Sequence, residues 1–321
     1  MAVASAGVSG PFNVLAGLAV SGSTLYVADF GLNLIHRLAL PSLSPAGSDI
    51  NASATPYCVT TDSLGNLYVG YYGIGLIEKF NSSGTSVATL STGGSVMGIA
   101  VDTNGDIYAA EESLGQVQIF PWNGTGYDAV QTITSPLFSG SLRGVLKQGN
   151  RLYVSDFSNS LIFQLNETSP HVFGAPQTLN DGGNISNPTQ LSTDSAGNLY
   201  VASASSSSVV AYAVNSTVNP SQLSLLRACV LDGMGPQGVA VDSQGYLYAS
   251  ASGAPFKVVQ IAPCGGTAMM MASKSQNGIN MTPTFTPTAT PPFSTLAQAA
   301  STVMSVFANS PNTPSANACS V

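Results

Sequence analysis

The chain has 321 residues, of which only 7% are charged, with 15 Asp or Glu against 8 Lys or Arg and a net charge of −7. This acidic balance excludes nucleic-acid binding, because phosphate binding needs clustered cations. With so few ions, Ser, Thr, Asn and Gly must hydrate the surface, which favours an extracellular or cell-surface location. No stretch of about 20 apolar residues predicts a transmembrane span, and residues 1–20 carry no Lys or Arg that would indicate a secretory signal.

One phrase recurs six times: an apolar run, a turn, and a strand centred on tyrosine. Its best copies are GIAVDTNGDIYAA at residues 98–110 and GVAVDSQGYLYAS at 238–250. The repeated tyrosines are Tyr26, Tyr68, Tyr108, Tyr153, Tyr200 and Tyr248, which are 42, 40, 45, 47 and 48 residues apart. A period of about 40 to 50 residues built from short strands is typical of propeller blades.

Each repeat predicts four strands in the same order. The first is the apolar run, such as 98–102, whose continuous apolarity fits a strand packed on both faces. A turn with Gly in third place follows at 63–66, 103–106, 195–198 and 243–246, because Gly reaches positive φ cheaply. The second strands are 25–29, 67–71, 107–111, 152–156, 199–203 and 247–251, and the third begin at Leu34, Leu76, Gln116, Leu161, Val209 and Lys257. The outer strands vary more.

Six such blades occupy nearly all of residues 1–273. We therefore predict an all-β fold, a six-bladed β-propeller of four-stranded antiparallel blades, followed by a Pro/Thr-rich C-terminal tail. The tail, residues 274–321, is rich in Pro, Thr and Ser, and its prolines favour polyproline II. A short helix is predicted at 294–309, with Leu296, Ala300, Val303 and Phe307 on one stripe that suggests self-association.

The pattern of Gly–aliphatic–Ala–Val–Asp, then Gly, then Leu–Tyr–Val–Ala–Asp resembles the NHL repeat, and the resemblance covers the chain from about Leu15 to Ala262. It implies a six-bladed propeller. The wider superfamily includes peptide-amidating lyases, streptogramin lyases, lactonases and propellers that only bind. Because one fold carries all of these, the resemblance does not choose among their functions.

Strand order brings the loops after the second and fourth strands to one mouth of the central channel, where the superfamily resemblance implies the site. The column at the start of the inner strands is Ala16, Tyr57, Met97, Arg143, Thr189 and Gln237, and the column at the end of the second strands is Asp29, Tyr71, Glu111, Asp156, Ser203 and Ala251. We predict that Tyr57, Tyr71, Glu111, Arg143 and Asp156 form a binding surface, because they gather the few charges beside aromatic rings.

Two interpretations of this polar cup remain open. Arg143 either orients an anionic or hydroxylated ligand or makes an ordinary salt bridge with Asp156 or Glu111. The carboxylates of Asp29, Glu111 and Asp156 either serve as acid, base or calcium ligands, or accept hydrogen bonds from the turn that follows each strand.

Histidine usage argues against the lyase chemistry. The resemblance to the amidating and streptogramin lyases implies histidines at the mouth, but the chain has only His36 and His171, and neither lies in a mouth column. A three-histidine zinc site therefore cannot be assembled, and we predict no metal and no cofactor. Without a GxSxG elbow or a histidine placed to activate a serine, we assign no catalytic residue.

The cysteines and sequons indicate covalent modification. Cys58, Cys229, Cys264 and Cys319 allow three pairings, and we favour a disulfide between Cys229 and Cys264, which fall in adjacent blades, although buried free thiols are the alternative. N-x-S/T sequons after the third strands predict glycosylation on the face opposite the mouth, at Asn81, Asn123, Asn166 and Asn215. The same residues also suit hairpin turns.

The leading interpretation is a secreted or surface-exposed propeller that acts as a binding or structural module for a protein or glycan partner, which favours binding over catalysis. One alternative is a diverged lyase or hydrolase of the same superfamily with a carboxylate site at the mouth. The second is a subunit of an extracellular homopolymeric scaffold assembled through the tail.

Overall fold

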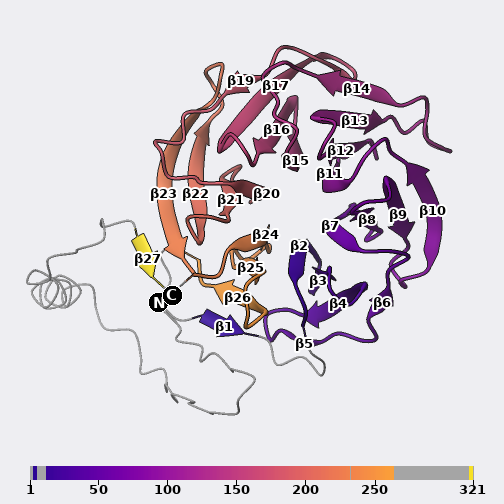
Figure 1. The fold of residues 1–321 in the computed structure, drawn as a ribbon, viewed down its shortest axis with the longest axis vertical. Helices are drawn as coiled ribbons and strands as arrows, with labels where there is room; N and C mark the ends of the chain where they lie inside the picture. Colours follow the sequence, from indigo (N-terminus) through magenta and orange to yellow (C-terminus); the bar gives the residue numbers. More distant parts are fainter. Residues whose placement is uncertain (1–2, 6–11, 232, 264–317, 321) are drawn as a thin grey trace, which may run out of the picture.

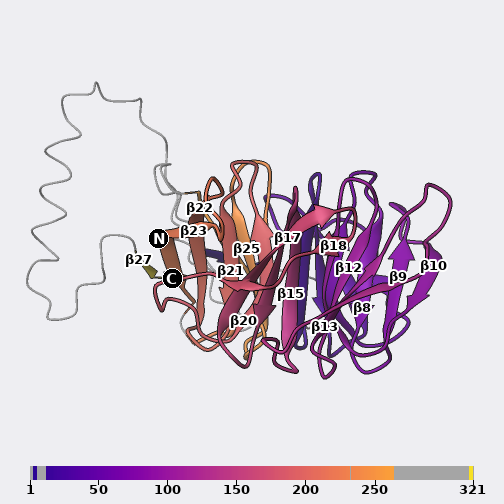
Figure 2. The same ribbon diagram turned by 90° about the horizontal axis from the view of Figure 1, so that it is seen from above.

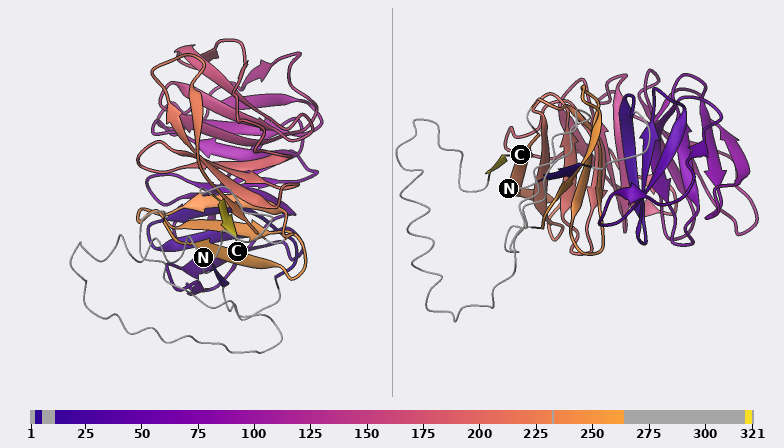
Figure 3. Two further views of the ribbon diagram at one scale, coloured as in Figure 1. Left: turned by 90° about the vertical axis from the view of Figure 1, so that its left-hand side faces the viewer. Right: turned by 90° about the horizontal axis from the view of Figure 1, so that it is seen from below.

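The computed structural model describes residues 3–5, 12–231, 233–263 and 318–320. Every regular element in these residues is a β-strand, and the strands form six sheets around one axis (Figure 1). Seen from the side, the ring is a flat disc (Figures 2 and 3). The predicted six-bladed propeller of four-stranded antiparallel blades is therefore confirmed.

In blades 1 to 3 the strands run outward from the axis in chain order. Blade 1 contains β2 (Leu15–Ser21), β3 (Thr24–Asp29), β4 (Leu34–Ala39), and the short β5 (Ser44–Pro45) and β6 (Ile50–Asn51). Blade 2 contains β7 (Pro56–Thr61), β8 (Leu67–Tyr71), β9 (Leu76–Phe80) and β10 (Ser86–Ser91). Blade 3 contains β11 (Val96–Val101), β12 (Ile107–Glu111), β13 (Gln116–Phe120) and β14 (Gln131–Thr134).

Blades 4 to 6 follow the same plan. Blade 4 contains β15 (Leu142–Gln148), β16 (Arg151–Asp156), β17 (Leu161–Ser169), and the short β18 (Val172–Phe173) and β19 (Gln177–Thr178). Blade 5 contains β20 (Pro188–Thr193), β21 (Leu199–Ser203), β22 (Ser208–Asn215) and β23 (Gln222–Val230). Blade 6 contains β24 (Pro236–Val241), β25 (Leu247–Ala251) and β26 (Lys257–Ile261).

The two ends of the chain complete blades 5 and 6. β1 (Val3–Ser5) pairs antiparallel with β26 and supplies the fourth strand of blade 6, so the first and last parts of the propeller are joined in one sheet. The repeat pattern did not indicate this closure, because β1 precedes the first repeat. β27 (Ala318–Ser320) pairs in parallel with β23 as a fifth strand of blade 5, and Figure 1 shows the two strands side by side.

Glycine is the third residue of most inner strands, because neighbouring inner strands approach closely around the axis at that position. A Cβ on Gly144 would lie 2.3 Å from the carbonyl oxygen of Thr189, and one on Gly238 would lie 2.5 Å from that of Ala16. Blade 5 has Gln190 at this position. Its side chain accepts hydrogen bonds from the Leu18 and Val239 amides at 2.9 and 3.1 Å, and so bridges three blades across the axis.

Carboxylates hold the hairpin between the first two strands in blades 2, 3, 5 and 6. In blade 6, Asp242 Oδ1 accepts the amides of Gln244 and Tyr246, both at 2.9 Å, and its Oδ2 accepts the Tyr248 hydroxyl at 2.8 Å. The pairs Asp62–Tyr68, Asp102–Tyr108 and Asp194–Tyr200 repeat this arrangement. The third-place glycines have positive φ, as predicted: Gly65, Gly105, Gly197 and Gly245.

The core lies between the blades, where each sheet packs its apolar faces against both neighbours. One cluster, for example, joins Val209 and Ala211 of blade 5 to Val239 and Val259 of blade 6. This packing makes the ring the single framework that fixes the positions of the loops at the two channel mouths. The described residues include no helix long and apolar enough to span a membrane.

The predicted sequons and tail have different outcomes. Asn81, Asn123 and Asn215 follow or end third strands, and each Oδ1 accepts the amide two residues on, as in Asx turns. Asn166 lies inside β17 instead of after it, because that strand continues to Ser169. Cys264, the boundary at 273/274 and the predicted helix at 294–309 lie outside the described residues.

Candidate functional site

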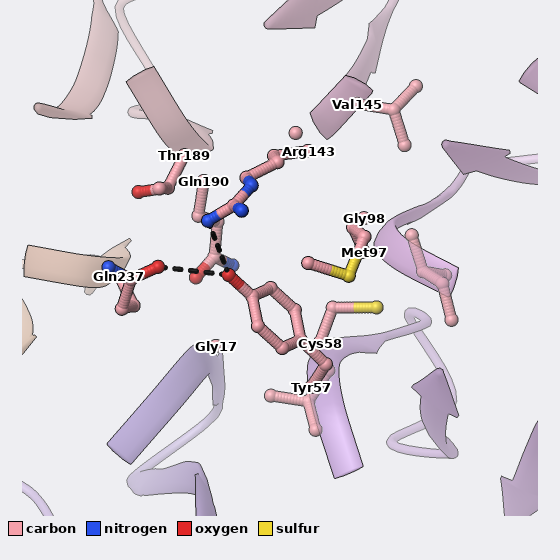
Figure 4. A pocket seen from close by; sticks show the side chains of 13 residues that line it. Gly17, Tyr57, Cys58, Met97, Gly98, Arg143, Val145, Thr189, Gln190 and Gln237 are labelled. Atoms are coloured by element: carbon pink, nitrogen blue, oxygen red, sulfur yellow. Dashed lines mark hydrogen bonds between the residues drawn. The ribbon is translucent and has the colours of Figure 1, made fainter. Parts of the chain in front are cut away.

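The second residues of the inner strands meet at one end of the channel, which we call the upper mouth. Tyr57, Met97, Arg143, Thr189 and Gln237 from five different blades all line the axis there, as the sequence predicted. Figure 4 shows their side chains converging. Each of these residues is the second of its strand. Because alternate side chains of a strand face the same side, the same position in each inner strand faces the axis.

Tyr57 is the centre of the upper mouth. Its hydroxyl donates to Gln237 Oε1 at 2.9 Å and accepts from Arg143 Nη1 at 3.2 Å (Figure 4). Burial raises the pKa of Tyr57 to about 12, and the Arg143 charge opposes this shift only in part. The hydroxyl is therefore neutral at ordinary pH and acts through hydrogen bonds.

Arg143 is held by the protein on three sides. Its Nη2 donates to Glu112 Oε1 at 3.0 Å, and its guanidinium carbon lies 3.7 Å from the centroid of the Phe157 ring. Both members of the ion pair have side chains 19% exposed. The predicted alternatives for the salt bridge, Glu111 or Asp156, are wrong, since Glu112 is the partner.

An open pocket of about 200 Å³ lies beside Tyr57 between blades 1, 2 and 6. Its walls are Phe30, Tyr57 and the apolar residues 14–16, and Gln237 and Ser252 supply its polar groups. Tyr72 extends the aromatic surface, with its ring centroid 5.7 Å from that of Phe30 and 43% of the residue exposed. A compact aromatic wall with a few polar groups is the usual construction of a small-molecule site.

The channel is narrow directly beneath the upper mouth. The space on the axis between the inner strands is only about 10 Å³, at the limit for one water molecule. A wider recess of about 290 Å³ opens at the opposite, lower mouth, where Lys147 and the Thr193 region line it. Gln190 borders both spaces, so its side chain lies between the narrow upper space and the wider lower recess.

Three of the five predicted site residues are not exposed at the mouth. Glu111 is fully buried and accepts the amides of Gly93 and Gly94 at 2.9 and 3.1 Å. Asp156 is also fully buried and accepts the Ser139 amide at 2.8 Å. The buried Tyr71 hydroxyl donates to Glu78 Oε2 at 2.5 Å. The structure brings together Tyr57 and Arg143 alone of the predicted set.

The residues that sequence reasoning missed stand one position later in the same column. Each second strand ends on a side chain that points into its blade, and the next residue faces the mouth, because neighbouring residues point to opposite sides. These next residues are Phe30, Tyr72, Glu112, Phe157, Ala204 and Ser252. The signal was present in the sequence as an aromatic-rich column, but a shift of one residue hid it.

A second polar cluster lies behind the pocket in blade 1. The His36 ring is buried between two carboxylates, with Nε2 3.0 Å from Asp29 Oδ2 and Nδ1 2.9 Å from Asp49 Oδ2. These hydrogen bonds raise the pKa of His36 even though burial, the largest single influence, opposes them. Asp29 also accepts the Asn13 amide at 2.9 Å and the Gly31 amide at 3.1 Å, which fixes both chain segments at the pocket rim.

In the described part of the chain no group of three or more His, Cys, Asp or Glu side chains is arranged to hold a metal ion. His171, the other histidine, follows β17, and its Nε2 lies 2.8 Å from Asp106 Oδ2. The Asp106 carboxylate also accepts the Trp122 amide at 2.6 Å. This histidine therefore joins blades 3 and 4 and takes no part in the upper mouth.

Comparison with solved structures shows the fold. The chain superposes on virginiamycin B lyase from Staphylococcus aureus with a TM-score of 0.58 and 13% identity, over 83% of this chain and 89% of that one. A luciferin-regenerating enzyme gives a TM-score of 0.60 and 13% identity, over 84% and 97%. The WD40 repeats of RRP9 give 0.56 and 13%, over 81% and 96%. Such low identities establish a shared β-propeller and nothing of activity.

At the level of sequence, no family model matches the chain and no curated protein matches it. The six-bladed propeller is thus established by its architecture, while an NHL assignment stays a prediction from the repeat pattern. Because the structural neighbours include both lyases and WD40 propellers, the site itself must supply the argument for function.

Proposed function

We propose that this chain is an NHL-type binding propeller whose upper mouth recognises a neutral, hydroxylated ring, such as a sugar residue of a glycan. The pocket beside Tyr57 carries the proposal. Its aromatic walls, Phe30 and Tyr57, offer apolar faces to the C–H groups of a sugar ring, while Gln237 and Ser252 offer hydrogen bonds to its hydroxyls.

The pairing of Arg143 favours a neutral ligand over an anion. Glu112 already balances the guanidinium charge, and the Tyr57 oxygen and the Phe157 ring take up two more of its interactions. An anion would have to displace Glu112 or share the cation with it, at an electrostatic cost. Arg143 instead donates to the Tyr57 hydroxyl, which in turn donates to Gln237 at the pocket wall.

The burial and hydrogen bonds of the mouth carboxylates favour binding over the lyase or hydrolase alternative. Asp29, Glu111 and Asp156 are fully buried, and their oxygens accept hydrogen bonds from neighbouring amides. Because these carboxylates are buried and bonded to the backbone, they are not exposed to a ligand in the mouth. The scaffold alternative depends on the tail, and no contact of the described residues favours it.

The test is saturation-transfer NMR with a panel of methyl glycosides, followed by calorimetric titration of any that bind. We expect Phe30→Ala to weaken binding about tenfold, equivalent to about 1.4 kcal/mol, because it removes one aromatic wall. Leu64→Ala is the matched control, since Leu64 is 81% exposed on a lower turn and remote from the mouth. If no glycoside receives saturation, or if Phe30→Ala binds as well as the parent, the proposed site is wrong.

We also propose an extracellular or cell-surface location, which is supported by the low content of charged residues and by the sequons. Asn123 and Asn215 are exposed on the turns that follow the third strands. Treatment of protein from a eukaryotic secretory host with an amidase that removes N-glycans should lower its mass. An unchanged mass would leave the asparagines with their turn-forming role only.

A further inference from the structure

A recess of about 140 Å³ lies between blades 2 and 3, which are neighbours in the ring (Figure 1). The lower turns at 62–64 and 102–105 form two of its sides, so it lies at the end of the blades opposite the upper mouth. Three aromatic rings and one cation complete the lining: Tyr68, Trp122, Tyr127 and Lys79. We call this recess the lower groove.

Lys79 is a cation without a hydrogen-bond acceptor in the described part of the chain. Its Nζ lies 5.0 Å from the centroid of the Tyr68 ring and 5.6 Å from that of Trp122, and its side chain is only 19% exposed. The nearest carboxylate oxygen, Asp62 Oδ2, is 4.0 Å away, which is too far for a hydrogen bond. Most other described cations place a nitrogen within 3.0 Å of an oxygen: Arg37, Arg143, Lys147, Arg151 and Arg227.

Asp62 does not serve as a full partner for this cation, because its own turn uses both of its oxygens. Oδ1 accepts the amides of Leu64 and Asn66 at 3.0 and 2.9 Å. Oδ2 accepts the Asn66 side chain at 2.7 Å and the Tyr68 hydroxyl at 3.0 Å. The equivalent carboxylate of blade 3 also accepts amides of its turn. The N–H donors of Lys79 therefore remain available to a ligand oxygen, and a mostly buried ammonium gains by finding one.

The cations beside the two aromatic recesses are paired differently, which favours different ligands. Arg143 at the upper mouth donates to Glu112 at 3.0 Å, whereas Lys79 donates to no carboxylate of the described residues. A ligand carboxylate on Lys79 would make a charge-assisted hydrogen bond, roughly twice as strong as a neutral one. An anion excluded from the upper mouth by Glu112 would therefore be accepted at the lower groove.

The apolar side chains of the lower groove favour a flat ring. Leu64 is apolar but 81% exposed at the edge of the groove, and the Trp122 ring forms part of the wall. A ligand ring that lies against both would remove apolar surface from water and add aromatic contacts. A recess of about 140 Å³ suits a single ring better than a drug-sized ligand.

We propose that the lower groove binds an aromatic carboxylate, with the carboxylate bonded to Lys79 and the ring packed against Leu64 and Trp122. The groove acts by reversible binding alone. This site is separate from the upper mouth and takes a ligand of opposite character, charged instead of neutral.

The single tryptophan of the chain makes the test direct, because Trp122 lines the lower groove. Benzoate is titrated into the full chain while the Trp122 fluorescence and the one indole N–H signal in the NMR spectrum of nitrogen-15-labelled protein are followed. Benzamide is the neutral control of similar shape. We expect saturable changes of both signals with benzoate and about tenfold weaker binding of benzamide, which lacks the charge-assisted bond.

Three variants locate the bound benzoate. Lys79→Met keeps an unbranched apolar stem and removes the charge, so it should weaken binding about tenfold. Lys257→Met is the matched control, because Lys257 likewise has no hydrogen-bond acceptor in the described residues but does not line the groove, and it should bind as the parent does. Leu64→Ala alters an exposed side chain and leaves the core intact, and it should weaken binding about threefold.

The proposal is overturned if benzoate leaves both Trp122 signals unchanged up to about 10 mM, or if benzamide binds as well as benzoate. It is also overturned if Lys79→Met and Leu64→Ala both bind benzoate as the parent does. Phe30→Ala, the variant that tests the upper mouth, should leave benzoate binding unchanged, and a loss of binding there would place benzoate at the upper mouth instead. The result is therefore independent of glycoside binding and of the proposed function.

Discussion

Blades 1 and 4 differ from the other four in lacking an aspartate at the hairpin between their first two strands. In blades 2, 3, 5 and 6 an aspartate ends the first strand and binds the tyrosine of the second, as Asp242 binds Tyr248. Blades 1 and 4 lack that aspartate and make two-residue turns, with Ser21 opposite Thr24 and Gln148 opposite Arg151. Their aspartates, Asp29 and Asp156, end the second strand and bind the loops of the upper face.

The tyrosine of the second strand is thus repeated in two kinds of blade, which use its hydroxyl differently. In four blades its hydroxyl is part of a lower turn, and in blade 4 the hydroxyl of Tyr153 has no carboxylate to bind. The aromatic ring is common to both kinds, since Tyr108 and Tyr153 are each almost fully buried between blades. The repeat thus selects tyrosine first for packing, and the hydrogen bond is an addition where an aspartate is present.

The largest effect should come from the upper-face aspartate of blade 4. The Asp156 carboxylate accepts hydrogen bonds from the Ser139 and Asn159 amides at 2.8 and 3.0 Å. Asp156→Ala leaves both amides without an acceptor. Because unmade bonds to buried donors are costly, we expect the free energy of unfolding to fall by about 3 kcal/mol. Urea denaturation measures it. A loss below about 1 kcal/mol would mean that the upper loops hold themselves without the carboxylate.

A lower-turn aspartate should matter less. Asp242→Ala removes the acceptor for the Gln244 and Tyr246 amides and for the Tyr248 hydroxyl, but these amides are closer to solvent and water replaces part of the loss. We expect a loss of about 2 kcal/mol, similar to that of removing a helix cap. Gln148→Ala, at the corresponding strand end of blade 4, is the control and should cost less. Equal losses would remove the distinction between the two kinds of blade.

The sequence predicted the lower turns better than the upper loops, and the reason is local. Gly65 and Gly105 adopt positive φ, and each lies within a few residues of the repeated apolar run. The repeat in the sequence was therefore enough to predict these turns. The upper mouth depends on which of two adjacent residues faces the axis, as with Glu111 and Glu112, and a one-residue uncertainty in a strand end reverses that choice. Closure by β1 depends on a pairing between residues 3 and 261, which no local pattern records.

The tyrosine hydroxyls give a smaller and cleaner comparison. Tyr248→Phe deletes a 2.8 Å bond to Asp242, and we expect it to cost about 1 kcal/mol. Tyr153→Phe keeps the same ring and deletes a hydroxyl with no carboxylate partner, so it should be nearly neutral. Paired urea titrations of the two variants measure the difference. If Tyr153→Phe is the more costly of the two, the tyrosine column is not explained by packing plus an optional hydrogen bond.

The subtlest contrast separates blade 1 from blade 4. His36, which pairs with Val27 in register, stands where blade 4 has Phe163, and it adds a titrating group to the aspartate that holds the upper loop. Its pKa is raised in the folded protein above the unfolded value of about 6.5. The stability that the charged ring contributes is therefore fully present below about pH 6.5 and is lost as the pH rises through the folded pKa.

We accordingly expect the difference in unfolding free energy between the parent and His36→Gln to shrink steadily from pH 6 to pH 9. Subtracting the variant cancels the groups common to both chains, including His171 with its partner Asp106. The cause is electrostatic: the imidazolium donates to Asp29 and Asp49 together, and a neutral ring can donate to only one of them. A difference that stays flat over this range would mean that His36 packs against Phe12 as a neutral ring, in which case blades 1 and 4 hold their upper loops in the same way.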